Sequence, residues 1–286
     1  MSRGAVRIAN DRFTLLSIWI YRRGSRMVLK DVISFLEEMC PGAFAQKWDN
    51  VGLLVGSPDM QVHTVGIALD ATTEVIEEAV REDVDLLLTH HPMIFGGIKR
   101  VTEDDFVGRR VLSLVRNSIA LYAMHTNFDV LGMADAAADL LKLTDREVLE
   151  VTYEDDLSVE GLGRIGTLQE PMRLRECAQR VAEVFGIKGV RYYGDPDEML
   201  VTCAVLPGAG KDEIDLALGS GADVMITGDI THHVGIDACE QGITVIDAGH
   251  YGMEKIFIPY MQECLERDLK ELRIISCDKG PPFCET

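Results

Sequence analysis

Positive charge is scarce in this sequence of 286 residues, and that limits what the protein can bind. There are 28 Lys and Arg against 47 Asp and Glu, a formal net charge of −19 at pH 7. The basic residues form no stripe that could follow a phosphate backbone, which argues against a nucleic-acid-binding protein. Six of the Arg fall within residues 1–26. We interpret that segment as a basic N-terminal extension, disordered or a misassigned start, ahead of a fold that begins at Met27.

Paired cysteines and long apolar runs are missing as well. No CxxC pair occurs and the number of cysteines is odd, which argues against a disulfide framework and favours a reducing, cytoplasmic location. The apolar stretch FTLLSIWIY has nine residues and is too short to cross a membrane. Most of the cysteines are expected to be small buried hydrophobic residues. The seven are Cys40, Cys177, Cys203, Cys239, Cys264, Cys277 and Cys284.

The hydrophobic pattern alternates between strands and helices. In the first half we expect strands at 64–70, 84–89 and 118–124 and helices at 27–39, 71–83, 105–116 and 133–143. Strands separated by helices of about this length are typical of βαβ units and a mostly parallel sheet.

The second half repeats this order loosely. It has expected strands within 200–210, 222–233 and 243–254, with helices at 211–221 and 234–241. The predicted fold class is therefore α/β, with two related lobes of mostly parallel strands. The lobes are placed at 27–150 and 151–286 and joined by the acidic, glycine-containing segment around 150–166. A site is expected at the carboxyl ends of the strands, between the lobes.

Six of the seven histidines follow apolar strands, and only His63 sits apart in a predicted turn. Any one of the six could be a hydrogen-bonded surface residue. Together they indicate a metal site, because ligands of open α/β sheets bind outside the carboxyl ends of the strands. The six are His90, His91, His125, His232, His233 and His250. The same strand ends supply three carboxylates: Asp129, Asp229 and Glu254.

His250 and Glu254 have helical i, i+4 spacing, so both can bind one ion if a helix begins near Gly249 or Tyr251. A local His–Glu pair is the alternative. Imidazole and carboxylate without thiolate suit Zn, Mn, Fe, Co or Ni. Five candidate ligands exceed the needs of one tetrahedral ion with an open position, whereas two bridged ions roughly 3.5–4 Å apart would use them all.

Two loops give weaker signals. The stretch LPGAGKDEID (206–215) could hold an anion at a helix start, but it fails the P-loop pattern and is predicted to be an ordinary strand-to-helix turn. The stretch WDNVGLL is predicted to be a structural loop. Asp49 and Asn50 would shape its turn and Trp48 would anchor it.

Five motifs in order, WDNVGLLVG, LLLTHHP, HTNFD, ITGDITHH and IDAGHYGME, resemble the family of NIF3-like dinuclear-metal proteins, some of which are described as type 2 GTP cyclohydrolases. The resemblance runs from Met27 to the C-terminus. It implies a two-lobed α/β protomer and a ring-shaped homohexamer whose metal sites face an internal cavity. The metal ligands that it implies are His90, His91, Asp129, His250 and Glu254.

Three further histidines, His125, His232 and His233, look like pocket residues of this family that could move protons or orient a substrate. One departure from the family pattern is Met253, where Thr or Ser is common. It removes a hydroxyl beside Glu254 and leaves the ligands intact.

The expected function is that of a metal-dependent hydrolase acting on a small anionic, nucleotide-like molecule, either like a type 2 GTP cyclohydrolase or as a phosphoesterase. Two divalent ions would activate water, and His125 or His233 would transfer protons. No guanine-reading motif is visible. The alternative is a metal chaperone, a storage protein or a partner-binding scaffold without turnover, because ligand sets for catalysis and for metal transfer look alike in sequence.

Overall fold

The computed structural model describes residues 27–283, so the predicted extension at 1–26 lies outside the described residues. The chain divides into two units, named here by their sheets. The five-stranded unit comprises residues 27–128 and Phe257–Gly280, and the six-stranded unit comprises Asp129–Ile256. Both are α/β units, which confirms the predicted pair of α/β lobes. The chain changes unit at Asp129 rather than near residue 150, because the strands that follow pair within the second sheet.

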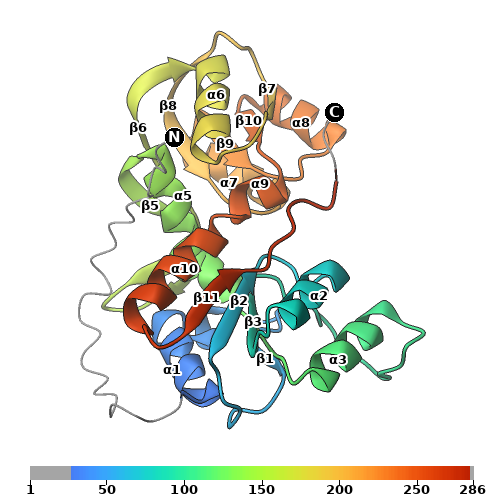
Figure 1. Ribbon diagram of the computed structural model, residues 1–286. Coiled ribbons are helices and arrows are strands. Elements are labelled where there is room, and N and C mark those ends of the chain that lie inside the picture. Colours follow the sequence, from blue (N-terminus) through green and yellow to red (C-terminus); the bar gives the residue numbers. More distant parts are fainter. Residues whose placement is uncertain (1–26, 284–286) are drawn as a thin grey trace, which may run out of the picture. The chain divides into compact units, whose positions relative to one another are not determined.

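The five-stranded sheet has the order β1-β4-β3-β2-β11. Four of its five strands, β4, β3, β2 and β11, run parallel to one another, and β1 lies antiparallel at one edge. The helices α2 and α3 lie on one side of this sheet and α1 and α10 on the other (Figure 1). The strands are β1 (Gly52–Val55), β2 (Thr64–Ala68), β3 (Leu86–Thr89), β4 (Ala120–Ala123) and β11 (Arg273–Ser276). The helices are α1 (Leu29–Met39), η2 (Gly42–Phe44), α2 (Thr73–Arg81), α3 (Phe106–Arg116), α4 (Thr126–Phe128) and α10 (Phe257–Asp268).

Strand β3 and helix α2 show why the local pattern was readable. Every residue of β3 is buried, as expected of a central parallel strand covered on both faces. Helix α2 begins after Thr72, whose side chain accepts a hydrogen bond from the Val75 amide at 3.2 Å. The buried side of α2 then closes over one face of the sheet. Because both faces of β3 are covered, polar side chains that follow it in the sequence can reach a ligand only beyond the carboxyl end of the strand.

The six-stranded sheet has the order β5-β6-β8-β9-β10-β7. Only β8, β9 and β10 are parallel neighbours, so the predicted predominance of parallel strands holds for the five-stranded sheet and not for this one. Helices α5, α6 and α9 pack on one face, and α7 and α8 pack on the other. The strands are β5 (Thr144–Glu154), β6 (Val159–Arg173), β7 (Arg191–Tyr193), β8 (Met199–Val205), β9 (Val224–Thr227) and β10 (Thr244–Asp247). The helical segments are η3 (Asp129–Met133), α5 (Ala134–Leu141), α6 (Leu174–Val184), η4 (Lys211–Glu213), α7 (Ile214–Gly219), α8 (His232–Gln241) and α9 (His250–Glu254).

The segment around 150–166 is not a connection between lobes. It forms the turn of a long β5–β6 hairpin and the parts of the two strands nearest to that turn. The Asp155 carboxylate closes the turn by accepting hydrogen bonds from the amides of Leu157 and Ser158. Antiparallel strands need only such a short turn, whereas parallel strands need a crossover. The polar, acidic composition of this segment is that of an exposed hairpin.

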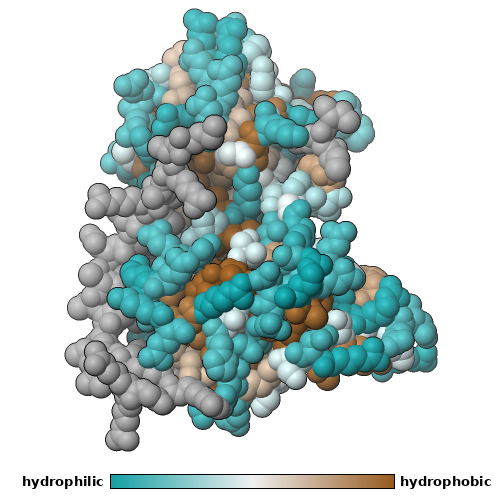
Figure 2. Space-filling model, viewed as in Figure 1, coloured by the Kyte–Doolittle hydropathy of each residue, from teal (hydrophilic) through white to brown (hydrophobic). Residues whose placement is uncertain are grey.

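Hydrophilic residues cover most of the face drawn in Figure 2, and hydrophobic residues reach that surface in patches between them. None of the helices within 27–283 is long and apolar enough to cross a membrane. Of the six cysteines in this range, all but Cys239 are buried, and burial raises the pKa of the Cys177 thiol to about 11.

Candidate metal centre

His90 and His91 follow the last residue of β3, where the strand's alternation has ended. Their ring centroids lie 4.8 Å apart, so both side chains can contribute to one site. His90 is fully buried and its Nδ1 lies 2.8 Å from the Met124 carbonyl oxygen. The Nδ1 of His91 lies 2.9 Å from Oδ1 of Asp70, which follows β2. In both rings a proton on Nδ1 leaves the lone pair on Nε2.

His125 follows β4, the neighbour of β3, and completes a group of three rings. Its centroid lies 5.2 Å from that of His90 and 5.4 Å from that of His91. One nitrogen from each of the three rings falls within 4.8 Å of the others, close enough to hold an ion together. The adjacency of β3 and β4 in the sheet therefore joins two motifs that lie more than thirty residues apart.

The Asp49 carboxylate holds the third ring in place. Its side chain is fully buried, and its Oδ1 lies 3.0 Å from Nδ1 of His125. It also accepts hydrogen bonds from the amide and hydroxyl of Thr126, at 3.1 and 2.6 Å, and from the Asn50 amide at 2.8 Å. Burial acts to raise the pKa of Asp49, but the hydrogen bonds from His125 and Thr126 outweigh it and lower the pKa to about 2. Asp49 thus stays ionised and orients His125.

Two exposed aromatic rings flank His125. The ring centroids of Trp48 and Phe95 each lie 5.9 Å from the His125 ring, with their planes at 72° and 85° to it. Trp48 is 63% exposed and Phe95 is 56% exposed. Aromatic side chains of this size usually lose most of their surface on folding, so their exposed faces next to a histidine cluster suit a planar ligand.

In the six-stranded unit, His250 and Glu254 form the two ends of helix α9. Helix α9 begins at His250, as the spacing predicted, and Nε2 of His250 lies 2.9 Å from Oε2 of the buried Glu254. The Nδ1 of His250 lies 3.1 Å from Oδ2 of Asp229. Asp229 has a φ of +58°, a left-handed conformation that Asp tolerates better than most residues, and its carboxylate reaches His250 from the loop after β9.

Two glycines allow the neighbouring loops to press against α9. A Cβ on Gly208, which has a φ of +87°, would lie 2.6 Å from Oε1 of Glu254. A Cβ on Gly228 would lie 2.5 Å from the amide nitrogen of His250. The loop LPGAG, predicted to be an ordinary strand-to-helix turn, is therefore also part of the packing that places Glu254.

Asp129 is the third candidate ligand in this unit. It is the first residue of η3, a single π-helical turn ahead of α5. One of its carboxylate oxygens lies within 4.8 Å of an oxygen of Glu254. Glu254 is therefore close both to His250 and to Asp129.

His232 and His233 do not lie at a strand end as predicted. Helix α8 begins at His232, two residues earlier than expected, so both histidines occupy its first turn. Their ring centroids lie 5.2 Å apart, and both residues are exposed. Neither belongs to a group of possible metal ligands among residues 27–283. His63 is an exposed turn residue, as its place in the sequence indicated.

One feature is common to the four histidines that lie within these two groups. In each, Nδ1 is hydrogen-bonded to an oxygen, which is the usual arrangement for histidines that bind metal through Nε2. The four histidines, each with its oxygen partner, are His90 with Met124, His91 with Asp70, His125 with Asp49 and His250 with Asp229. Sequence reasoning missed the partner roles of Asp49 and Asp70. A search of every strand end for carboxylates would have found Asp70.

The chain is similar to known proteins over most of its length. The family model described as Duf34/NIF3 (NGG1p interacting factor 3) matches residues 27–281. A protein from Clostridium acetobutylicum named "GTP cyclohydrolase 1 type 2 homolog" is 35% identical over 248 residues, which cover 86% of this chain and 92% of that protein. Among solved structures, a Bacillus cereus protein related to NIF3 has a TM-score of 0.83 at 26% identity, covering 92% of this chain and all of that one. Reduced HcgD from Methanocaldococcus jannaschii has a TM-score of 0.78 at 34% identity and covers 89% of this chain and 99% of that one.

Proposed function

Because the chain belongs to the Duf34/NIF3 family, we propose that it is a metal-dependent hydrolase that binds two divalent ions and acts on a small nucleotide-like substrate. The observation that carries the proposal is the shared orientation of the candidate ligand histidines, each fixed through Nδ1 by an oxygen. Side chains that served only as surface polar groups would not need this support. The proposed ligands are His90, His91, Asp129, His250 and Glu254.

The donor set fits such ions. Three imidazoles and two carboxylates, with no thiolate, suit Zn, Mn, Fe, Co or Ni. When bound, divalent ions supply Lewis acidity, which activates water and polarises the bond under attack.

His125 is the proposed proton-transfer residue. Asp49 accepts the hydrogen bond from its Nδ1, so Nε2 is the nitrogen that can take up or deliver a proton. The His125 ring of this dyad belongs to the three-histidine group and lies beside the exposed rings of Trp48 and Phe95. Stacking on those rings would hold the base of a nucleotide next to His125.

The curated relatives named for GTP cyclohydrolase make GTP the first substrate to test, followed by a panel of phosphoesters. The test is metal content and initial rate measured on the same preparation. Wild type should carry close to two ions per chain. The variant His125→Ala should keep most of that metal and lose at least tenfold in rate. The matched control is His63→Ala, which removes an exposed histidine of the same unit and should change neither quantity.

Three outcomes would change the proposal. If metal falls in step with rate in His125→Ala, that residue is a ligand and not a proton carrier. If His233→Ala loses rate while His125→Ala does not, proton transfer belongs to the exposed start of α8. If metal-loaded wild type hydrolyses nothing across the panel, the protein is a metal carrier, storage protein or scaffold. The homohexamer implied by the family resemblance is tested by light scattering of the same preparation.

A further inference from the structure

The side chain of Arg164, on β6, is buried and has all its donors used. Only 5% of it is exposed. Its Nε and Nη2 donate to the two oxygens of Asp135 at 2.8 and 3.0 Å. Its Nη1 donates to the carbonyls of Gly161 and Gly163 at 3.0 and 2.8 Å, and Nη2 also donates to the Val130 carbonyl at 3.4 Å. A guanidinium has five N–H groups, and here each has an acceptor.

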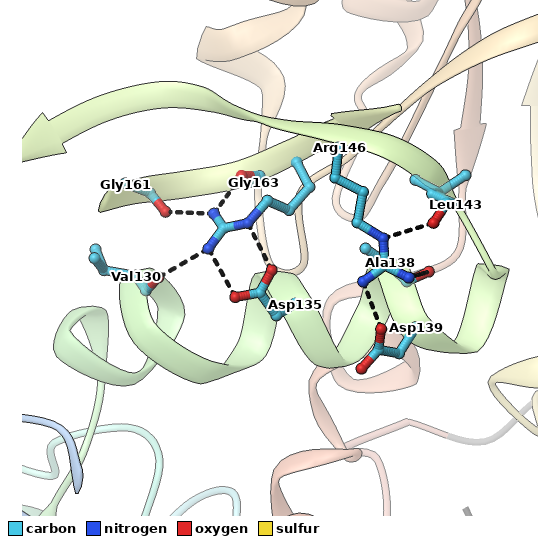
Figure 3. Close-up of polar contacts among 9 residues, drawn as sticks. Val130, Asp135, Ala138, Asp139, Leu143, Arg146, Gly161 and Gly163 are labelled. Carbon is cyan, nitrogen blue, oxygen red and sulfur yellow. Dashed lines mark hydrogen bonds and ion pairs between the residues drawn. The ribbon is translucent and has the colours of Figure 1, made fainter. Parts of the chain in front are cut away.

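The strand that carries Arg164 is built to supply those carbonyls. A Cβ on Gly161 would collide with the carbonyl oxygen of Glu150 on the paired strand. Gly163 has a φ of +64°, where a side chain is strained. The two glycines thus let β6 turn both carbonyls toward the guanidinium, as Figure 3 shows for Gly161 and Gly163. This local design, in the sequence GLGR, exceeds what an ordinary edge hairpin requires.

The remaining acceptors of Arg164 lie within the π-helical turn η3 and just after it. Val130 is its second residue, and Asp135 lies in the first turn of α5 directly after it. A π-helical turn carries an extra residue and is less stable than α-helix, so it persists where other contacts support it, often at functional sites. Arg164 supplies such contacts by bonding at once to Val130 within the turn and to Asp135 in the helix that follows it.

We propose that Arg164 is a positioning residue for metal binding. Its bonds to Val130 and Asp135 hold η3 in its π-helical form, and η3 begins with Asp129. The direction of the Asp129 carboxylate follows from that backbone. The inference rests on the proposed function only in taking Asp129 as a metal ligand.

The chain offers a matched control, Arg146 on β5, which contacts the same helix α5. Arg146 pairs with Asp139, one turn after Asp135, and donates to the carbonyls of Ala138 and Leu143 at 3.1 and 2.7 Å. Figure 3 shows this second guanidinium at the far end of α5 from Val130. Both arginines tie α5 to its surroundings, but only Arg164 contacts η3 within the described residues.

The experiment compares Arg164→Lys with Arg146→Lys by chelator competition, using Co²⁺ and the metal-free full-length protein, together with thermal unfolding. Arg164→Lys keeps the charge but cannot reach five acceptors. We expect its weaker-bound ion to lose about 10- to 100-fold in affinity, a typical effect of removing support from a ligand. Arg146→Lys should bind both ions as wild type does, whatever it loses in Tm.

A double-mutant cycle separates positioning from general stability. In an Asp129→Ala background, Arg164→Lys should have no further effect on Co²⁺ affinity, whereas a merely structural role would lower affinity again. Unchanged affinity in Arg164→Lys, or an equal loss in Arg146→Lys, would overturn the inference while leaving the proposed function intact. If wild type binds only one ion, the dinuclear proposal fails, and the same comparison on that ion still decides the role of Arg164. Should Arg164→Lys not fold, Asp135→Asn replaces it, with Asp139→Asn as its control.

Discussion

Replacing Asp49 with asparagine should have two effects at once. It should destabilise the five-stranded unit, and it should weaken the hydrogen bond that orients His125. Both carboxylate oxygens of Asp49 accept a backbone amide: Oδ1 that of Asn50 and Oδ2 that of Thr126. Asparagine has one acceptor and one donor end. Whichever way its amide is turned, an NH₂ group must therefore face a backbone N–H in a fully buried position.

The size of the effect can be worked out in two ways, both of which count the hydrogen bonds to the Asp49 carboxylate. A buried donor left without an acceptor costs about 1–3 kcal/mol. The pKa of about 2 for Asp49, against about 3.9 for an unfolded Asp, corresponds to about 2–3 kcal/mol of stability at neutral pH. We therefore expect Asp49→Asn to lose about 2–3 kcal/mol in free energy of unfolding at pH 7.

The direction of the pKa shift also predicts how the loss of stability changes with pH. Because the folded pKa of Asp49 is lowered, its contribution is present above about pH 4 and is lost as the pH falls through about 2. The difference between wild type and Asp49→Asn should therefore be constant from pH 7 to 5 and shrink below pH 4. Urea unfolding of the metal-free proteins, followed by far-UV circular dichroism, measures it without a contribution from bound metal.

The control is Asp155→Asn in the β5–β6 turn. Hydrogen bonds from Tyr153, Leu157 and Ser158 also lower the pKa of Asp155, but its carboxylate is exposed to solvent, so its loss should be much smaller. If the two variants lose the same stability, burial of Asp49 is not the cause. The reasoning also fails if Asp49→Asn keeps wild-type hydrolysis at pH 7, because His125 would then act without the partner of its Nδ1.

Three further predictions concern the ligands and their surroundings. Gly208→Ala should displace Glu254 and lower metal content, measured by atomic absorption, whereas Gly242→Ala has the same backbone strain with nothing within 4 Å of its Cβ and should leave metal unchanged. Glu254→Gln should lower occupancy toward one ion or fewer while circular dichroism stays that of wild type; full occupancy would remove Glu254 from the ligand set. Trp48→Ala should raise the KM for GTP about tenfold or more at unchanged metal content, since stacking on an aromatic side chain is worth about 1–3 kcal/mol per base. The control is Leu157→Ala, which shortens the side chain of a 94% exposed residue elsewhere. An equal change in KM in both variants would refute a base-binding role for Trp48.

Local periodicity was enough to locate the strands that end in histidine. The run Leu86–Thr89 is wholly buried in the sheet, and three leucines and a threonine followed by two histidines identify the carboxyl end of the strand. The i, i+4 spacing of His250 and Glu254 likewise predicted α9, because side chains one helical turn apart face the same way. Both results depend on residues within about one turn or one strand of each other.

Helix and strand boundaries limited the accuracy of the site prediction. His232 and His233 follow β9 closely in sequence, but Thr231 already precedes helix α8, so both side chains lie on an exposed helical turn. The pattern of apolar residues does not distinguish the last residue of a loop from the first residue of a helix. Only the backbone conformation after Asp229 separates these two histidines from the strand ends.

The sequence by itself determined which strands carry imidazole and carboxylate, since a strand's burial and its end are written in consecutive residues. Tertiary structure alone decided which groups support them. Asp49 meets His125 across 76 positions because antiparallel pairing places the start of β1 beside the end of β4, and Asp70 meets His91 across 21 positions because β2 and β3 are parallel neighbours that end side by side. The β5–β6 hairpin, whose Arg164 reaches back to Val130, was hidden for the same reason. Pairing between distant segments depends on the free energy of the whole packed unit, and no window of neighbouring residues contains it.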